Sequence, residues 1–442
     1  MSEKKYPTEL LKTWNKCKAI RKKAYDDYFN KEKAGIRWAG GGWTPGVLVL
    51  GLGDDVYPLT GEAYGATMSY FRDFSNKCLE TAETAGYPRT LCAYERNYVG
   101  GILRNEYVLA DGSVHKGIPK PDFLFQAHIC CTHGKWYQTV GELEGGIPYF
   151  GIDISVGQYD EIDEKKINYV VKQMDDAIKW LEQITGRKYD DGKLIDAVKN
   201  EFRSTSLWAE ICDLNKAVPA PIDEKSMYSY YPMLNWARAT KELADFYEEV
   251  RDEIKERVDR GIAAVADEKF RLMMDGQPPW SFLNIFRYLE KYGAVTIGSL
   301  YTFSLNGAWD AIKPEKGDYL SLIPRKTPMD KGIEINDRET ALRLLAEWDV
   351  TRPVYQQFYS EKIRAQLCVG IMHDWKMDGA IFHLNRGCEG MSLGVSEAKL
   401  AVQKAGFPTV SYEGNMGDVR EFDESIARAS IDAFLEAQGL RK

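Results

Sequence analysis

The sequence predicts an α/β protein with two doubly wound parallel-sheet lobes and a helical insert between them. Two patterns support this fold class. Short apolar runs alternate with helix-length segments in both halves of the chain, which is typical of parallel sheets covered on both faces. About a hundred central residues show helical spacing alone. We expect an N-terminal helical segment, a first α/β lobe, a helical region and a second α/β lobe, at 1–35, 36–162, 163–262 and 263–442.

The first lobe is predicted from one helical segment, a glycine-rich turn and four strands. Residues 5–33 are charged and have a helical pattern, and the turn Gly40-Gly41-Gly42 follows them. Four apolar runs then resemble buried strands. They lie at 47–53, 89–94, 122–127 and 149–154.

The helical region begins at residues 163–186, where apolar side chains recur at helical spacing and Gly186 is a stop signal. Helical patterning continues through 191–218 and 226–262, and we interpret the charged face of the latter as a solvated surface. Strand patterns then return, and a closing helix ends the second lobe. The strands are expected at 271–276, 294–301, 378–384 and 408–414, and the helix at 421–438.

Composition excludes several functional classes. With 44% hydrophobic and 28% charged residues, the chain has the composition of a folded, soluble protein. No apolar stretch approaches the roughly 20 residues needed to cross a bilayer, and MSEKKYPTELLK lacks the apolar core of a signal peptide. The formal charge of −8, without a basic cluster, argues against a nucleic-acid surface. We expect a cytoplasmic protein that binds neither membrane nor nucleic acid.

The cysteines give the main indication of chemistry. Eight cysteines in a cytoplasmic chain are better interpreted as thiols or metal ligands than as disulfides. Three positions follow predicted strands: Cys92, the pair Cys130-Cys131, and Cys388 in HLNRGCEG. The binding crevice of an open parallel sheet lies beyond the carboxyl ends of its strands. Thiols from the two lobes are therefore candidates for one shared metal site.

The pattern alone leaves three interpretations open. Neither ferredoxin-type nor zinc-type cysteine spacing is present, so separate buried thiols remain the simpler interpretation. A nucleophilic cysteine would need a base, and His383 is the nearest histidine in sequence to Cys388. The remaining cysteines lie in helical patterns and are expected to be buried small hydrophobic residues. They are Cys17, Cys78, Cys212 and Cys368.

Phosphate-binding motifs are missing from the chain. The segment GRKYDDGKL has the wrong spacing for a P-loop, and Gly51-Leu52-Gly53 does not complete a dinucleotide fingerprint. If nucleotide hydrolysis drives the reaction, another chain is expected to perform it.

Five segments together resemble a known family. TLCAYERNYVGGIL, QAHICCTHGKWYQ, LEKYGAVTIGS, HLNRGCEGMSLG and GDVREFDESIARASIDAFLE are similar to the benzoyl-CoA reductase and 2-hydroxyacyl-CoA dehydratase family. The resemblance extends from about residue 45 to the C-terminus. Within the family, HLNRGCEG and the overall length look most like the larger electron-accepting subunit of ATP-dependent benzoyl-CoA reductase.

The resemblance implies a [4Fe-4S] cluster on three cysteines, with one iron left without a protein thiolate. Carried over, the ligands are Cys92, one of Cys130 and Cys131, and Cys388, and the following Lys135-Trp136 favours Cys130. Gly387 and Gly390 would let the backbone pass close to the cluster. Arg386 either offsets negative charge there or lies on the surface.

The resemblance also implies an activity and its partners. The expected reaction is reduction of the aromatic ring of benzoyl-CoA to a cyclic diene thioester, in a complex with a second homologous cluster-bearing subunit. ATP-hydrolysing iron–sulfur activator subunits would deliver electrons that come from reduced ferredoxin. Two alternatives stay open: a 2-hydroxyacyl-CoA dehydratase subunit that works through a ketyl radical, and a non-catalytic iron–sulfur carrier or scaffold. His133, His383 and Glu389 lie beside the implied ligands, and the catalytic acid stays unassigned.

Overall fold

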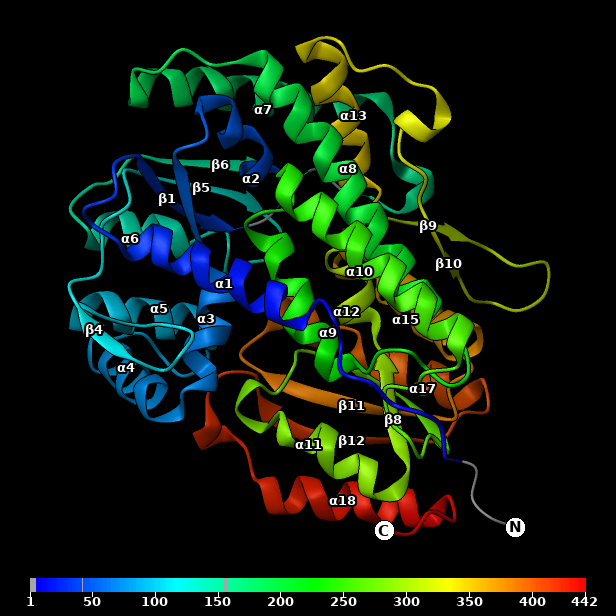
Figure 1. The fold of residues 1–442 in the computed structure, drawn as a ribbon. Coiled ribbons are helices and arrows are strands. Elements are labelled where there is room, and N and C mark those ends of the chain that lie inside the picture. Colours follow the sequence, from blue (N-terminus) through cyan, green and yellow to red (C-terminus); the bar gives the residue numbers. More distant parts are fainter. Residues whose placement is uncertain (1–4, 42, 155–156) are drawn as a thin grey trace.

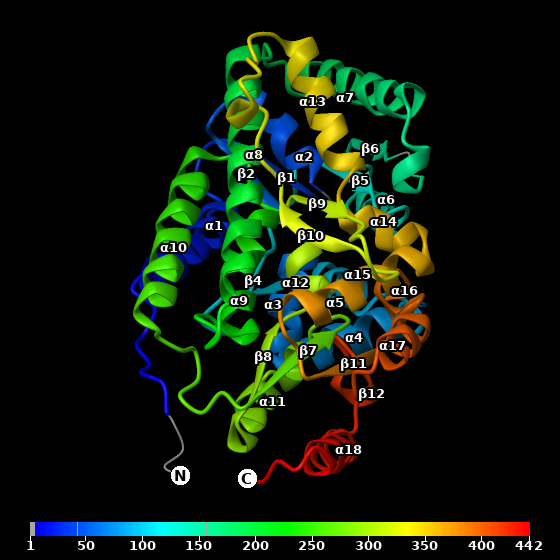
Figure 2. The ribbon, with the colours of Figure 1, turned by 90° about the vertical axis from the view of Figure 1, so that its right-hand side faces the viewer.

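The computed structural model describes residues 5–41, 43–154 and 157–442 and contains two four-stranded parallel sheets (Figure 1). This confirms the predicted fold class. The first sheet has the order β2-β1-β5-β6 and the second β12-β11-β7-β8. Figures 1 and 2 show the first sheet in the upper half of the molecule and the second in the lower half.

The strands of each sheet come from one half of the chain. The first sheet is formed by β1 (Ile36–Gly41), β2 (Val56–Thr60), β5 (Phe123–His128) and β6 (Tyr149–Asp153). The second is formed by β7 (Phe270–Asp275), β8 (Ala294–Gly298), β11 (Gly379–Arg386) and β12 (Thr409–Asn415). Two small antiparallel hairpins that the sequence pattern did not predict are β3–β4 (Glu106–Val108, Val114–Lys116) and β9–β10 (Trp309–Ile312, Ser321–Pro324).

Helices surround both sheets. Those of the first half are α1 (Trp14–Phe29), α2 (Thr44–Leu48), α3 (Gly61–Tyr70), α4 (Arg72–Thr84), α5 (Ala93–Arg104) and α6 (Trp136–Leu143). The central ones are α7 (Glu164–Thr185), α8 (Asp191–Leu214), α9 (Glu224–Tyr230) and α10 (Lys241–Arg260). The last are α11 (Asn284–Leu289), α12 (Leu300–Ser304), α13 (Arg338–Val350), α14 (Pro353–Tyr359), α15 (Glu361–Asp374), α16 (Glu389–Ser392), α17 (Val395–Lys404) and α18 (Glu424–Ala437).

The predicted strand at 47–53 is wrong. Residues Thr44–Leu48 form α2 and a 3-10 turn follows at Val49–Leu52, because Pro45 fits the first turn of a helix and cannot donate to a sheet. The first strand is β1, where the sequence predicted a turn. Gly40 is part of this strand. Only glycine fits at this position, because a Cβ there would lie 1.7 Å from the Phe125 carbonyl oxygen on β5. Gly42 lies outside the described residues.

The predicted strand at 89–94 is also wrong. Residue Cys92 is the N-cap of α5, so this thiol stands at the start of a helix and not at the end of a strand. The predictions for the insert and the second lobe agree more closely with the structure. Helix α7 ends at Gly186, whose φ of +67° gives the left-handed cap that glycine favours. The long helices α8 and α10 pack on each other beside both lobes (Figure 2).

One hydrophobic core joins the two lobes. A continuous cluster of buried side chains includes Leu59 and Leu124 of the first sheet, Leu272 and Ile381 of the second, and Phe246 of α10. The lobes therefore do not separate into independently packed bodies, and the junction between them is a fixed part of the fold.

Candidate active site at the junction of the two lobes

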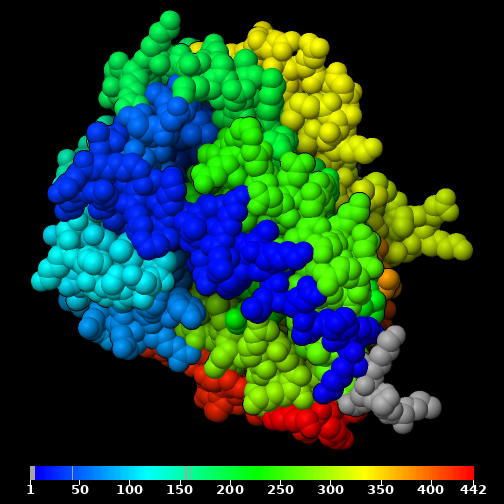
Figure 3. Space-filling view, in the orientation of Figure 1, coloured from blue at the N-terminus to red at the C-terminus, as the bar shows by residue number. Residues whose placement is uncertain are grey.

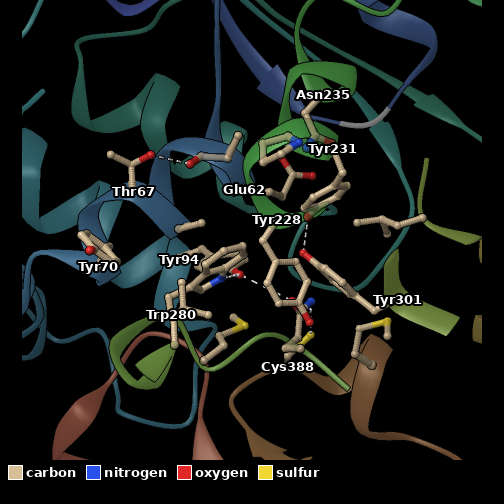
Figure 4. A pocket seen from close by; sticks show the side chains of 18 of the residues that line it. Glu62, Thr67, Tyr70, Tyr94, Tyr228, Tyr231, Asn235, Trp280, Tyr301 and Cys388 are labelled. Carbon is tan, nitrogen blue, oxygen red and sulfur yellow. Dashed lines mark hydrogen bonds between the residues drawn. The ribbon is translucent and has the colours of Figure 1, made fainter. Parts of the chain in front are cut away.

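A cavity of about 830 Å³ lies where the two lobes meet (Figure 4). Its wall combines residues from α1, α3 and α5 with residues from α9, the β7–α11 segment and the β11–α16 segment. Three of the four cysteines singled out from the sequence line it: Cys92, Cys130 and Cys388. Residues nearly three hundred positions apart thus share one wall.

Cys92 is buried at the beginning of α5. Burial raises the pKa of its thiol well above the usual value, and the backbone N–H groups of Tyr94 and Glu95 lower it in part. These N–H groups belong to the first turn of a helix, where they have no partner within the helix. These N–H groups therefore favour the thiolate form of Cys92, although neither forms a hydrogen bond with the Cys92 side chain.

Cys130 and Cys131 are neighbours with opposite environments. Cys130 lines the cavity, and burial raises the pKa of its thiol while the backbone N–H of His133 lowers it. Cys131 is exposed, and its sulfur donates to Glu389 Oε2 at 2.7 Å. Partial burial and this carboxylate raise the pKa of Cys131 to about 11. Of the pair, only Cys130 lines the cavity.

Cys388 follows β11 in the second lobe. Burial raises the pKa of its thiol. Its sulfur accepts from Gln277 Nε2 at 3.5 Å, and the buried Arg364, which binds Asp275 at 2.9 Å, favours its thiolate. Cys388 and Cys130 add to the effect of burial on the pKa of Cys92, because three thiolates in one place repel one another. A cationic centre bound among the three sulfurs would remove that repulsion.

The donor set of the cavity wall consists of thiols, whose thiolates are the ligands that iron–sulfur clusters use. Within the described ranges, no group of three or more His, Cys, Asp and Glu side chains is arranged to hold one metal ion. A cluster spreads its thiolate ligands further apart than one ion does. Gly390 lies beside Cys130: a Cβ there would be in ordinary van der Waals contact with the Cys130 Cβ, at 3.5 Å, and closer, at 3.2 Å, to the Phe358 ring.

An ion pair between the buried His133 and the half-buried Glu62 forms another part of the wall. Glu62, in the first turn of α3, contacts His133 Nε2 through Oε1 at 2.6 Å, and His133 Nδ1 donates to the Ala127 carbonyl at 3.3 Å. Burial lowers the pKa of His133, but Glu62, the Ala127 carbonyl and Glu95 together raise it by more, so the pKa lies above its usual value. Gly41 makes room for the pair, because a Cβ there would lie 2.9 Å from a Glu62 carboxylate oxygen.

Reasoning from the sequence missed Glu62. The signal that could have found it is the rule used for the cysteines, since Glu62 follows β2 closely, at the carboxyl edge of the first sheet. The residue was missed because the sequence pattern did not predict β2.

Aromatic side chains make up much of the remaining wall (Figure 4). Trp280 donates its indole N–H to the Tyr94 hydroxyl, and the hydroxyls of Tyr231 and Tyr301 bond to each other. Because these polar tips satisfy one another, the rings present mainly apolar surface to the cavity.

The other residues suggested by the sequence lie elsewhere. Burial lowers the pKa of His383 to about 4, and the neutral ring donates to the Gln277 carbonyl at 2.6 Å and stacks on Tyr412. Arg386 is exposed and pairs with Glu413 on the neighbouring strand. The four cysteines expected in helical cores are all buried, as predicted.

Comparison with known proteins points to one family. A family model described as 2-hydroxyglutaryl-CoA dehydratase, D-component, matches residues 61–437. The chain is 28% identical over 424 residues to the (R)-2-hydroxyisocaproyl-CoA dehydratase alpha subunit of Clostridioides difficile, covering 94% of each chain.

Three further relatives extend the range of activities among similar proteins. The (R)-phenyllactyl-CoA dehydratase alpha subunit of Clostridium sporogenes is 27% identical over 392 residues, covering 88% of this chain and 85% of the relative, and the beta subunit of that enzyme also matches, at 23%. A benzoyl-CoA reductase subunit of Thauera aromatica is 24% identical over 383 residues, covering 84% of this chain and 82% of the relative. Across the described residues, no helix is long and apolar enough to cross a bilayer.

Proposed function

The chain belongs to the family described as 2-hydroxyglutaryl-CoA dehydratase, D-component, and from that premise we propose that it is one of two cluster-bearing subunits of a 2-hydroxyacyl-CoA dehydratase. We further propose that Cys92, Cys130 and Cys388 hold a [4Fe-4S] cluster. The observation that carries the proposal is the placement of three thiols from two lobes on the wall of one cavity, each with a hydrogen-bond donor near its sulfur.

Dehydration replaces ring reduction as the preferred activity. The sequence motifs alone favour the benzoyl-CoA reductase subunit, but the relatives described above are mostly dehydratase subunits, and the dehydratase alpha subunit from Clostridioides difficile is matched over more of its length than the reductase subunit. The reductase remains the second candidate because its subunit from Thauera aromatica is also matched over most of its length.

Different groups of residues in the cavity have different roles in the proposed reaction. When bound, the cluster would supply low-potential electrons to the thioester. Buried aromatic walls exclude water from the cavity, which strengthens every charge interaction inside it. Glu62 and His133 share a proton at the Oε1–Nε2 contact, and this pair is the acid–base group that faces the substrate space.

The assembly is proposed from the relatives as well. This chain matches both the alpha and the beta subunit of one enzyme, so those two subunits are homologous to each other. We propose a second homologous, cluster-bearing chain as the partner. The ATP-hydrolysing iron–sulfur activator and reduced ferredoxin expected from the resemblance remain part of the proposal.

Iron analysis tests the cluster. We expect the chain, purified anaerobically with its co-expressed neighbours, to hold roughly four irons and a characteristic paramagnetic signal on reduction. Cys388→Ala should lose most of the iron, whereas the matched control Cys212→Ala, a buried cysteine outside the cavity, should retain it. Equal iron in the two variants, or a colourless wild-type protein, would contradict the proposal.

The ATP requirement separates the two activities. A dehydratase returns its electron after each turnover and therefore needs ATP only for activation, whereas a reductase consumes electrons and ATP in every cycle. Loss of water from a 2-hydroxyacyl-CoA with far less ATP hydrolysed than product formed supports the dehydratase. A fixed ATP-to-product ratio with an aromatic thioester supports the reductase.

A further inference from the structure

The charges that line the cavity are unevenly distributed. Four cationic side chains stand on α1, α4, α9 and α11, and all are half-buried or exposed. They are Arg21, Arg72, Lys225 and Arg287. Figure 3 shows α1, in blue, crossing beside the green α9–α10 segment. These four cations form the rim of the cavity.

Two of the rim cations are available to a ligand. Arg72 donates to the Ser281 carbonyl, and Arg287 pairs with Glu290 and Asp223. Arg21 and Lys225 form no ion pair with any other described residue. Cations without a protein partner at the mouth of a deep cavity suit an anionic group that stays near solvent, such as a phosphate.

The inner wall of the cavity differs from the rim in its charge. Apart from His133, which is already paired with Glu62, its lining has no cationic side chain among the described residues. The carboxylates that act on the cavity thiols are Glu62 and Glu389, and both disfavour further negative charge. The surface is otherwise largely aromatic, formed by Tyr94, Tyr228, Tyr231, Trp236, Trp280 and Tyr301.

We propose that this difference in charge between the rim and the inner wall selects the substrate. The rim cations Arg21 and Lys225 hold the phosphates of coenzyme A, and the aromatic inner wall accepts only an uncharged, bulky acyl group. This inference rests on the proposed function and extends it to the substrate class. A second carboxylate on the acyl chain, as in a glutaryl group, would enter a space with no free cation among the described residues and would face Glu62. Burying a charge without a partner is strongly unfavourable, so dicarboxylic thioesters are excluded.

The size of the cavity supports a large acyl group. Its volume of about 830 Å³ is within the range of cavities that bury a drug-sized ligand. Aromatic walls gain most from contact with a ring or a branched chain, which covers apolar surface and stacks on it. A phenyl-bearing or branched 2-hydroxyacyl chain therefore fits better than a short one.

Anaerobic calorimetry on the complete cluster-bearing complex tests the acyl preference. The probes are phenyllactyl-CoA, 2-hydroxyglutaryl-CoA and free CoA. We expect phenyllactyl-CoA to bind at least tenfold more tightly than 2-hydroxyglutaryl-CoA. Equal affinities, or tighter binding of the dicarboxylic thioester, overturn the proposal. Glu62→Gln should reduce the difference in affinity between the two thioesters, because it removes the repulsive carboxylate. An unchanged difference in affinity also counts against the proposal.

Two substitutions at the rim test the phosphate contact. The double variant Arg21→Met, Lys225→Met should lower the affinity for all three probes by a similar factor of about ten and reduce the salt dependence of binding. The matched control Lys404→Met removes an exposed cation from α17, outside the cavity, and should bind as the wild type does. Unchanged affinity for free CoA in the double variant overturns the phosphate contact.

Iron content keeps this proposal separate from the proposed function. If the acyl preference and the rim effect appear in a protein without iron, the cavity assignment stands and the dehydratase proposal fails. If the protein holds its cluster and dehydrates a thioester, but binds the dicarboxylic substrate as well as the phenyl one, the function stands and this inference fails.

Discussion

The two lobes place their thiols on the cavity in different ways. In each lobe an inner strand of the sheet leads directly to a cysteine: β5 to Cys130 in the first and β11 to Cys388 in the second. The first lobe adds Cys92, which is placed by the start of α5. The sheets thus position the sulfurs of Cys130 and Cys388, whereas the position of the Cys92 sulfur depends on the packing of α5.

A buried ion network holds that helix against the second lobe. Arg96 on α5 donates to the Leu91 carbonyl, next to Cys92, and pairs with Glu83 at 2.9 Å. It also pairs at 3.1 Å with Asp418, which follows β12 in the second lobe, and both of these side chains are fully buried. Cys92 therefore takes its position from both lobes.

The largest predicted effect comes from removing the thiol that β5 places on the cavity wall. Cys130→Ser should lose most of the bound iron, because it removes the only sulfur of the doubled cysteine that lines the cavity. Cys131→Ser is the matched control and should keep the iron of the wild type, since Cys131 is exposed beside Glu389. Iron analysis of the two purified variants measures this, and a reversed result would assign Cys131 as the ligand.

A smaller effect is expected when the link between the lobes is cut. Asp418→Asn leaves the buried Arg96 guanidinium without one of its two carboxylates, and we expect a loss of about 3 kcal/mol in the free energy of unfolding. Urea unfolding with the cluster-free protein measures it. The same experiment on Glu413→Gln, which breaks the exposed pair with Arg386, should show less than about 1 kcal/mol. Similar losses in both variants would show that the network does not join the lobes.

The second lobe is joined to α9 by a neutral contact instead of a charged one. Ser299 and Thr302 donate to Glu224 Oε1 at 2.6 and 3.0 Å. Burial raises the pKa of Glu224 to about 8, although these hydroxyls lower it in part. The folded protein therefore keeps a proton that the unfolded chain, with a carboxyl pKa of 4.5, releases.

The free energy of unfolding should consequently fall as the pH rises from about 4.5 to about 8. We expect the wild type to lose roughly 1–3 kcal/mol between about pH 5 and pH 8 through this group. Glu224→Gln keeps an oxygen acceptor for both hydroxyls and removes the titration, so its loss over the same range should be smaller. Denaturant unfolding at several pH values measures the difference. Parallel pH profiles for the two proteins would show that Glu224 is ionised in the folded state.

The sequence predicted the second lobe better than the first, for physical reasons. Strands β7, β11 and β12 are runs of strand-forming residues between clear breaks, and helix α7 has a full helical repeat that ends at a glycine. The run at 47–53 is as apolar as a strand but too short to distinguish a strand from a helix. Strand β1 was missed because its glycines resemble a turn, whereas Gly40 is required by the close approach of β5.

The candidate site was predicted only where residue type carried the signal. The cysteines could be singled out because thiols serve few roles, but whether Cys130 or Cys131 faces inward depends on the turn after β5, which the sequence does not specify. Glu62 and Arg364 are ordinary charged residues in the sequence. Their importance comes from contacts with His133 and Asp275, which only the folded chain brings together.

The spread of the three cavity cysteines along the chain bears on how the protein is made. Cys92 and Cys130 leave the ribosome early, whereas Cys388 and Asp418, which complete the thiol set and anchor α5, are synthesised much later. A nascent chain that has only its first sheet cannot enclose an inorganic centre. If the three cysteines hold a cluster, as proposed, its last protein ligand becomes available only when translation is nearly finished.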